Sequence, residues 1–166
     1  GGTKLGNSIR SLLLDTSRGK GPDSITELLL YAADRSQHVN EIIRPTLYKG
    51  DWVISDRFCG STLAYQGYGR KLDLQLIKHL ETISTQGISP DITFFLDIPV
   101  AESMKRRINR KDDRIEEEGR NFLLDVSLGF QILSKDSKWK TISAMNSKEN
   151  VISEIQSEIK KLIRNK

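Results

Sequence analysis

Cysteine is almost missing from this chain, and other features that would assign it to a particular protein class are missing too. Cys59 is the one cysteine in 166 residues, so no disulfide can form within the chain, and a reducing cytoplasm is the expected location. No apolar run approaches the roughly 18 residues of a membrane span, and no segment has the charged-then-apolar pattern of a signal peptide. We therefore expect no membrane partner. The two histidines, His38 and His79, suggest no metal-binding spacing.

A large excess of one charge is also missing. The 26 lysines and arginines outnumber the 22 aspartates and glutamates only slightly, leaving a net charge of +4. This charge suits small anionic ligands, but it is too low to indicate nucleic acid, and no basic stripe with interleaved aromatics supports that partner. The hydrophobic fraction of 37% and the charged fraction of 29% are ordinary for a soluble globular protein. A length of 166 residues predicts one domain, residues 1–166.

The sequence does contain an alternation of strand-like and helix-like patterns. Short apolar runs predict strands at 51–56, 92–97 and 140–144, the first two of them buried. Apolar residues at helical spacing predict helices near 5–13, from 24 toward Pro45, at 72–85, from Pro99 to 110, at 122–133 and at 149–163. The spacing of Ser24 and Glu27 fits a capping box at the start of the second helix. The alternation indicates an α/β fold whose mostly parallel sheet is flanked by helices, although three strands are few for that architecture.

The most informative stretch is Asp51 to Arg57, in which the apolar residues Trp52 to Ile54 are followed closely by Asp56 and Arg57. In open parallel sheets, ligands bind just beyond the carboxyl ends of the strands. A carboxylate in that place can hold a metal or a hydroxyl, and a guanidinium can hold a phosphate through two hydrogen bonds. A surface ion pair or a helix cap explains the two residues equally well. The segment that follows, Phe58 to Gly67, is predicted to be a polar loop.

Other candidate residues also have an ordinary alternative. Arg35 follows Tyr31 by four residues on a predicted helix, so the two side chains share a face and could meet a flat ligand, although a core tyrosine beside a surface arginine fits as well. Cys59 is best interpreted as a small packed hydrophobe because no histidine is near it in sequence. Residues 105–120 contain seven basic residues interleaved with acids, which usually indicates a solvated face. Because the segment comes soon after the strand that ends at Asp97, it could instead close over the ligand edge of the sheet.

In their order and spacing, several segments resemble the thymidylate kinase family from the first residue to the last helix. The matching segments are Gly1-Gly2-Thr3, like the end of the family's Arg-Glu-Pro-Gly-Gly-Thr motif; Tyr31 to Arg35; Asp56-Arg57; Ser61 to Gln66, similar to Ser-(Ser/Thr)-x-x-Tyr-Gln; and Arg110 to Glu116, similar to a lid with its Asp-Arg-(Ile/Leu)-Glu ending. Each match alone is weak. The ordered set is specific, and it places the lid at about 105–120.

The resemblance implies a fold, a reaction and partners. The implied fold is a three-layer P-loop kinase-type fold, here lacking its first strand or strands. The implied reaction is phosphoryl transfer from ATP, with Mg²⁺, to dTMP, giving ADP and dTDP for dTTP biosynthesis. Family members pair as homodimers through helices. The apolar face of the helix from residue 24 toward Pro45 could therefore serve either the core or such an interface.

The resemblance also implies roles for individual residues. For the base and sugar of dTMP, it implies that Tyr31 stacks on the base, that Arg35 bonds an exocyclic oxygen, and that Thr62 and Gln66 contact the pyrimidine edge and the sugar. It also implies a further substrate contact by Tyr65. For the dTMP phosphate, it implies binding by Arg57 with help from Arg10. For catalysis and ATP, it implies Asp56 near magnesium, through water, Arg110 at the transition state and at ATP, Arg106 at ATP and Arg114 fixing the lid. Because no covalent intermediate is needed, these roles amount to alignment and charge neutralisation.

The chief departure from the family is the phosphate loop. No Gly-x-x-x-x-Gly-Lys-(Ser/Thr) motif occurs in the 166 residues, whereas the family carries one upstream of the Gly-Gly-Thr motif. We expect the chain to start inside a longer protein and to be inactive, or barely active, by itself. Two alternatives stay open: another nucleoside or nucleotide kinase, and a non-catalytic remnant that keeps the dTMP pocket.

Overall fold

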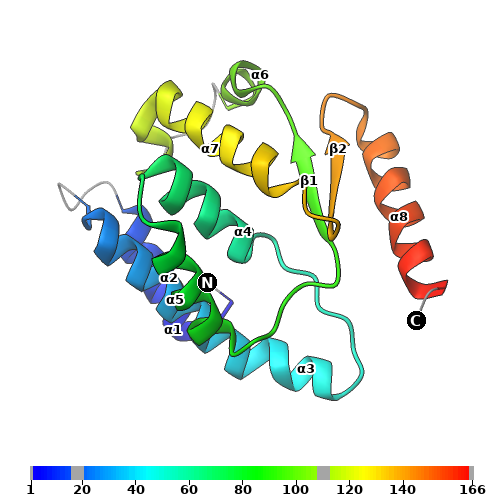
Figure 1. Cartoon of the computed structure of the whole chain (residues 1–166), viewed down its shortest axis with the longest axis horizontal. Coiled ribbons are helices and arrows are strands. Elements are labelled where there is room, and N and C mark those ends of the chain that lie inside the picture. Colours follow the sequence, from blue (N-terminus) through cyan, green and yellow to red (C-terminus); the bar gives the residue numbers. More distant parts are fainter. Residues whose placement is uncertain (1, 16–20, 108–112, 165–166) are drawn as a thin grey trace. The chain divides into compact units, whose positions relative to one another are not determined.

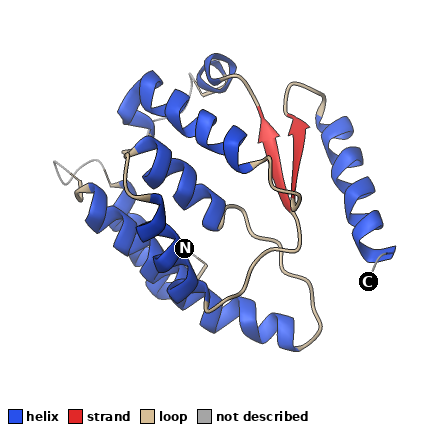
Figure 2. Cartoon of the chain, in the orientation of Figure 1, coloured by secondary structure: helices blue, strands red, loops and turns tan. Residues whose placement is uncertain are grey.

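The computed structural model describes residues 2–15, 21–107 and 113–164 (Figure 1). The chain forms two compact units, one of residues 1–89 and 111–130 and the other of residues 90–110 and 131–166. Helices dominate, and the described strands form a small parallel sheet (Figure 2). The expected α/β class is confirmed at this level. No helix in the described ranges is long and apolar enough to span a membrane.

The first unit consists of helices. Its elements are α1 (Lys4–Leu14), α2 (Ser24–His38), the π-helical turn η2 (Val39–Ile43), α3 (Arg44–Tyr48), α4 (Cys59–Thr62), the π-helical segment η3 (Leu63–Gly69), α5 (Leu74–Thr85), the 3₁₀ turn η4 (Glu116–Glu118) and most of α7 (Gly119–Leu133). Helix α2 packs against both α1 and α5. Apolar residues at helical spacing, such as Leu13 on α1, Leu28 on α2 and Ile77 on α5, are buried in this core.

The long helix predicted from residue 24 is confirmed, and it continues past Pro45 to Tyr48. Its predicted capping box is wrong. The N-cap is Asp23, whose Oδ1 accepts hydrogen bonds from the backbone amides of Ile25 and Thr26 at 3.0 and 3.1 Å. Asp caps a helix as well as Ser does, and Glu27 has cationic partners in the interior instead of reaching back to the cap.

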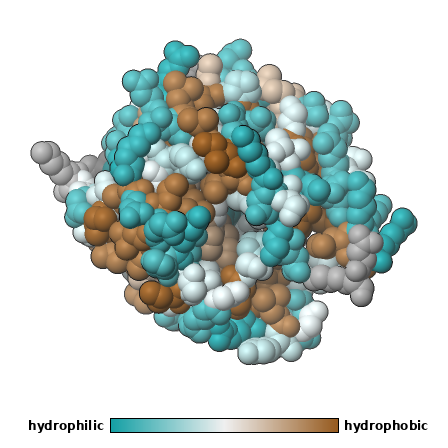
Figure 3. Space-filling view, viewed as in Figure 1, coloured by the Kyte–Doolittle hydropathy of each residue, from teal (hydrophilic) through white to brown (hydrophobic). Residues whose placement is uncertain are grey.

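The strand predicted at 51–56 is wrong, because these residues are neither helix nor strand. Trp52 is 60% exposed and Ile54 is 92% exposed, so the predicted burial is wrong as well. A strand requires a neighbour that accepts and donates its backbone hydrogen bonds, and no strand in the described residues pairs with this segment. Elsewhere on the surface, apolar side chains also emerge, as the brown areas of Figure 3 show.

The polar loop predicted after Arg57 is helical from Cys59 to Gly69. Hydrophobic periodicity did not predict this helix because two of its buried residues, Thr62 and Gln66, are polar. Both have hydrogen-bond partners inside the unit, and this makes their burial possible. The polar residues of this segment therefore belong to a packed helix.

The second unit contains the sheet. Its elements are β1 (Thr93–Asp97), α6 (Val100–Lys105), β2 (Trp139–Ser143) and α8 (Lys148–Arg164), and α8 lies beside β2. The two strands are parallel, with Thr93 opposite Trp139 and Asp97 opposite Ser143. The predicted strands at 92–97 and 140–144 and the last helix are confirmed within one residue. Strand β1 is half-buried rather than buried, and residues 108–110 of the helix predicted after Pro99 lie outside the described residues.

Candidate functional site

One face of α2 carries three polar side chains at intervals of four residues: Glu27, Tyr31 and Arg35. Tyr31 is partly buried; burial, together with the negative charge of Glu27, raises the pKa of its hydroxyl. Tyr31 and Arg35 are two of the predicted site residues, whereas Glu27 was assigned to a cap. The same four-residue spacing was the signal that could have found it.

Arg35 reaches from α2 to the helix that begins at Cys59. Its Nη2 donates hydrogen bonds to the hydroxyl of Thr62 and to the carbonyl oxygen of Phe58, the latter at 3.5 Å. Its Cζ lies 5.6 Å from the centre of the Phe58 ring, within cation–π range. The structure thus brings together Arg35 and Thr62, two residues predicted to read a base, from segments 27 positions apart.

Arg57 has a left-handed backbone, with φ of +70°. For a residue with a side chain, this conformation costs roughly 1–2 kcal/mol, and such strain is concentrated at functional sites. The hydroxyl of Ser55 donates to the Arg57 carbonyl at 2.7 Å, and the guanidinium Cζ lies 5.0 Å from the centre of the Tyr65 ring. Arg57 and its neighbour Asp56 are exposed. A guanidinium that lies against an aromatic ring on an exposed residue is suited to an anion.

The carboxylate of Glu27 is fully buried and accepts several hydrogen bonds. Gln66 Nε2 donates to its Oε1 at 2.8 Å, Arg70 donates through Nε at 3.3 Å and Nη2 at 3.1 Å, and Arg114 donates through Nη2. Burial disfavours the charged form, but these donors outweigh it and lower the pKa of Glu27, so the carboxylate is ionised at neutral pH. Arg114 also donates from Nε to the carbonyl of Leu13 at 2.7 Å.

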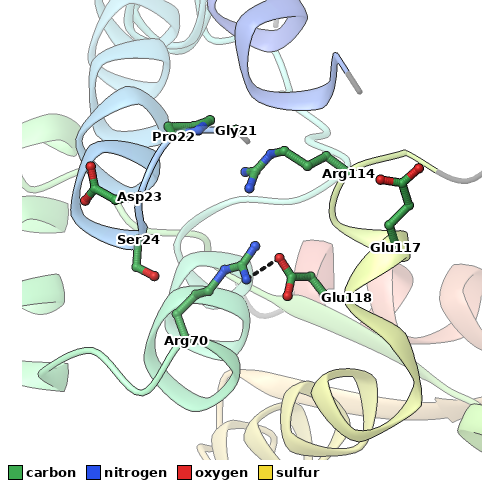
Figure 4. A pocket seen from close by; sticks show the side chains of 8 residues that line it. All are labelled: Gly21, Pro22, Asp23, Ser24, Arg70, Arg114, Glu117 and Glu118. Atoms are coloured by element: carbon green, nitrogen blue, oxygen red, sulfur yellow. Dashed lines mark ion pairs between the residues drawn. The ribbon is translucent and has the colours of Figure 1, made fainter. Parts of the chain in front are cut away.

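A cavity of about 360 Å³ lies beside this cluster (Figure 4). Its lining residues are Gly21, Pro22, Asp23, Ser24, Arg70, Arg114, Glu117 and Glu118. Arg70 and Glu118 face each other as an ion pair, and the Arg70 guanidinium also stacks 4.8 Å from the Phe122 ring centre. Both arginines on the wall are engaged by carboxylates. With three carboxylates and two guanidinium groups on its lining, this cavity differs from the surroundings of Arg57.

The remaining predicted site residues lie elsewhere. Arg10 is exposed on α1, and none of the contacts just described involves it. Arg106 is in the second unit, where it donates to Glu102 Oε1 and to the Ala144 carbonyl, both at 3.0 Å. Arg110 lies outside the described residues. Within the described ranges, no group of three histidine, cysteine, aspartate or glutamate residues could hold a metal ion, so Asp56 contributes a single carboxylate.

Two partly buried ionisable groups near Arg35, Glu81 and Cys59, were not predicted to be unusual. Burial raises the pKa of Glu81 on α5 to about 7, against the opposing charges of Arg35 and Lys78. No hydrogen-bond donor among the described residues reaches its Oε1. Burial likewise raises the pKa of the Cys59 thiol to about 11. A thiol with this pKa is a poor nucleophile at neutral pH, in keeping with the interpretation of Cys59 as a packed side chain.

Comparison with known proteins decides the family. The family model described as thymidylate kinase matches residues 1–155. The chain belongs to the thymidylate kinase family. The curated thymidylate kinase of Prochlorococcus marinus strain NATL2A is 80% identical over all of this chain and 79% of its own length. That of strain MIT 9313 is 52% identical over 96% of this chain and 74% of its own length. The curated thymidylate kinase of Synechococcus sp. strain CC9902 is 58% identical over 89% of this chain and 70% of its own length.

Membership of the thymidylate kinase family confirms the resemblance drawn from the motifs. The family has a P-loop kinase fold, and the helix-rich structure with its small parallel sheet agrees with that class. The motifs at Tyr31–Arg35, Asp56–Arg57 and Ser61–Gln66 all fall in the first unit. These are the segments that the contacts of Arg35, Arg57 and Glu27 bring together.

Proposed function

We propose that this chain serves in a thymidylate kinase, which transfers a phosphoryl group from ATP to dTMP and so supplies dTDP for dTTP synthesis. The observation that carries the proposal is the gathering of base-reading and phosphate-binding groups in the first unit. Tyr31 offers a ring, Arg35 offers a guanidinium held on Thr62, and Arg57 offers a second guanidinium beside Tyr65. A flat base, its carbonyl oxygen and a phosphate match these groups in turn.

Catalysis in this proposal is alignment and charge neutralisation. Arg57, assisted by Arg10, holds the dTMP phosphate in line for attack, while Arg110 neutralises charge at the transition state and Arg106 contacts ATP. Arg114, which binds Glu27 and the Leu13 carbonyl, has the contacts of a residue that anchors the end of the lid.

Magnesium is the metal that we propose accompanies ATP. Mg²⁺ keeps several waters and takes one or two protein carboxylates together with the substrate's phosphates. A single exposed carboxylate, Asp56, fits that requirement, whereas a closed protein cage of ligands is not needed. When bound, the ion would neutralise charge on the phosphates.

A substrate panel tests this function. In the enzyme expressed from its complete reading frame, ADP release is measured with dTMP, dUMP, dCMP and thymidine. We expect dTMP to be preferred, and Arg57→Met to lower turnover by roughly a hundredfold or more because the phosphate loses charged hydrogen bonds. Arg164→Met, an exposed arginine at the end of α8, is the matched control and should change little. A preference for thymidine or dCMP would assign the chain to another nucleotide kinase.

The 166-residue polypeptide is proposed to bind dTMP without efficient transfer. It contains no Gly-x-x-x-x-Gly-Lys-(Ser/Thr) motif to hold ATP phosphates. Calorimetric titration should therefore detect dTMP binding and little ATP binding. Turnover equal to that of the enzyme from the complete reading frame would overturn this part of the proposal.

A cytoplasmic homodimer is proposed as the assembly. The apolar residues Leu28, Val39 and Ile43 are buried within the chain, so they serve the core. Ile25 and Leu29 on α2 stay exposed and are the better candidates for a helix-mediated interface. Sedimentation analysis should give a dimer, and Leu29→Glu should shift it to a monomer.

A further inference from the structure

Gln66 is a buried amide whose orientation is set by its neighbour Glu27. Its side chain is 2% exposed, and its Nε2 donates to Glu27 Oε1 at 2.8 Å. An ionised carboxylate accepts hydrogen bonds and donates none. The amide must therefore turn its NH₂ group toward Glu27, because the opposite orientation would place two acceptor oxygens against each other. The carbonyl oxygen of Gln66 consequently faces away from Glu27.

Glu27 is itself fixed and cannot turn aside to release the amide. Arg70 donates hydrogen bonds to both of its carboxylate oxygens, and Arg114 donates one to Oε2. Arg114 is fixed in turn by the Leu13 carbonyl on α1. The donor and acceptor ends of the Gln66 amide are thus determined by a network of charged hydrogen bonds built into the first unit.

A second group of fixed polarity, the Arg35 guanidinium, reaches the same helix from α2, and it can only donate hydrogen bonds. Thr62 lies four residues before Gln66, and its hydroxyl accepts a hydrogen bond from Arg35. A donor, the Arg35 guanidinium, and an acceptor, the Gln66 carbonyl, therefore both belong to the proposed base-reading site. Thymine and uracil present an acceptor oxygen at ring position 4 and an N–H donor at position 3. Cytosine presents an amino donor and an acceptor nitrogen in these places.

We propose that Glu27 is a specificity-determining positioning residue, which fixes the Gln66 amide so that the site selects a pyrimidine monophosphate with an N–H at ring position 3. Glu27 does not contact the nucleotide and acts through Gln66. The inference rests on the proposed function, and it deepens that function by naming what rejects a cytosine nucleotide. A site with fixed polarity rejects the wrong edge strongly, because its buried polar groups are then left unpaired.

The test compares Glu27→Gln with the wild-type 166-residue chain, using calorimetric titration of dTMP and displacement by dCMP. With a neutral amide at position 27, Gln66 is free to flip, so the ratio of the dCMP to the dTMP dissociation constant should fall about tenfold or more. Glu118→Gln is the matched control, since Glu118 pairs with Arg70 in the same cluster, whereas the Gln66 amide donates to Glu27. The control should keep the ratio within about twofold.

This ratio separates positioning from mere stability, because a loosened fold weakens both nucleotides together. Glu27→Asp, which keeps the charge for the arginines but withdraws the carboxylate from Gln66, should lower the ratio in the same direction. If neither variant folds, NMR of wild-type protein with bound dTMP decides. A thymine imino proton protected from exchange with water supports an acceptor at Gln66, and an unprotected one overturns it.

The outcomes distinguish this inference from the proposed function. A wild-type chain that binds no dTMP would overturn the proposed function and the inference with it. Wild-type binding of dTMP, together with an unchanged ratio in a folded Glu27→Gln variant, overturns the inference alone.

Discussion

The two units contain carboxylate–arginine pairs of the same chemistry in different surroundings. In the first unit, Glu27 is 0% exposed and is bound by Arg70 and Arg114. In the second, Glu102 and Arg106 pair at 3.0 Å with side chains that are 28% and 48% exposed. An exposed pair contributes roughly 0.2–1 kcal/mol, whereas removing one partner of a buried pair costs about 3–5 kcal/mol. Burial, more than the presence of the pair, decides how much the fold depends on it.

The strongest test of this difference is Glu27→Ala. The change removes the buried carboxylate that Arg114 and Arg70 share, and although Arg70 keeps Glu118, the free energy of unfolding should fall by up to about 3–5 kcal/mol. Urea denaturation followed by circular dichroism measures it. A loss below about 1 kcal/mol would mean that water reaches the cluster and that the two units do not differ in this respect.

A substitution at Glu81 tests how burial affects a carboxyl that lacks the hydrogen-bond donors of Glu27. Its pKa is raised to about 7 in the folded chain from a usual 4.5, so the folded state binds the proton more tightly. The contribution of Glu81 to stability is present below about pH 4.5 and is lost as the pH rises through about 7, a change on the order of 3 kcal/mol. Glu81→Gln should remove this dependence and unfold at a higher urea concentration than wild type at pH 8. Parallel pH profiles for variant and wild type would contradict the assignment.

Substitutions at Arg57 test whether an exposed arginine with a strained backbone conformation is needed for dTMP binding. Arg57→Gly relieves its left-handed backbone and should stabilise the chain by about 1 kcal/mol while abolishing dTMP binding. Lys71 is the matched control, with φ of +61° and an exposed pair to Asp125. Lys71→Gly should stabilise to a similar extent and leave dTMP affinity unchanged. Melting temperatures and calorimetry provide the two measurements, and equal loss of affinity in both variants would contradict the role of Arg57.

The smallest effect is expected in the second unit. Glu102→Gln removes the half-exposed carboxylate that pairs with Arg106, which still donates to the Ala144 carbonyl. The free energy of unfolding should change by no more than about 0.5 kcal/mol, and that change should shrink as salt is added. An effect comparable with that of Glu27→Ala would remove the contrast between the units.

Most helices, and the two paired strands, could be predicted because their patterns are local. Ile9 and Leu13 on α1 are buried and the apolar run of β1 is half-buried, and each pattern lies within a single segment. The apolar residues Trp52 to Ile54 gave the same local signal, but they have no hydrogen-bonding neighbour in the described residues. Periodicity reports which side chains are apolar and cannot report whether a second strand is present.

The site was predictable where a motif is contiguous and unpredictable where partners are distant. Tyr31 to Arg35 and Asp56-Arg57 were found as short motifs, and their roles in binding stay predictions. The bond between Glu27 and Arg114 joins residues 87 positions apart. A buried glutamate is indistinguishable from a surface one until such partners are placed around it, so its spacing of four from Tyr31 was the one local clue.

The high pKa of Cys59 makes the single cysteine of this chain a reporter on the neighbouring helices. With a pKa of about 11, roughly one thiol in ten thousand is ionised at pH 7, so alkylating reagents react very slowly with the closed structure. Local unfolding that exposed the thiol to water would restore its ordinary reactivity. The rate of labelling would therefore measure local unfolding around Arg35 and Thr62, and a ligand that stabilises this region would lengthen the labelling time without any introduced probe.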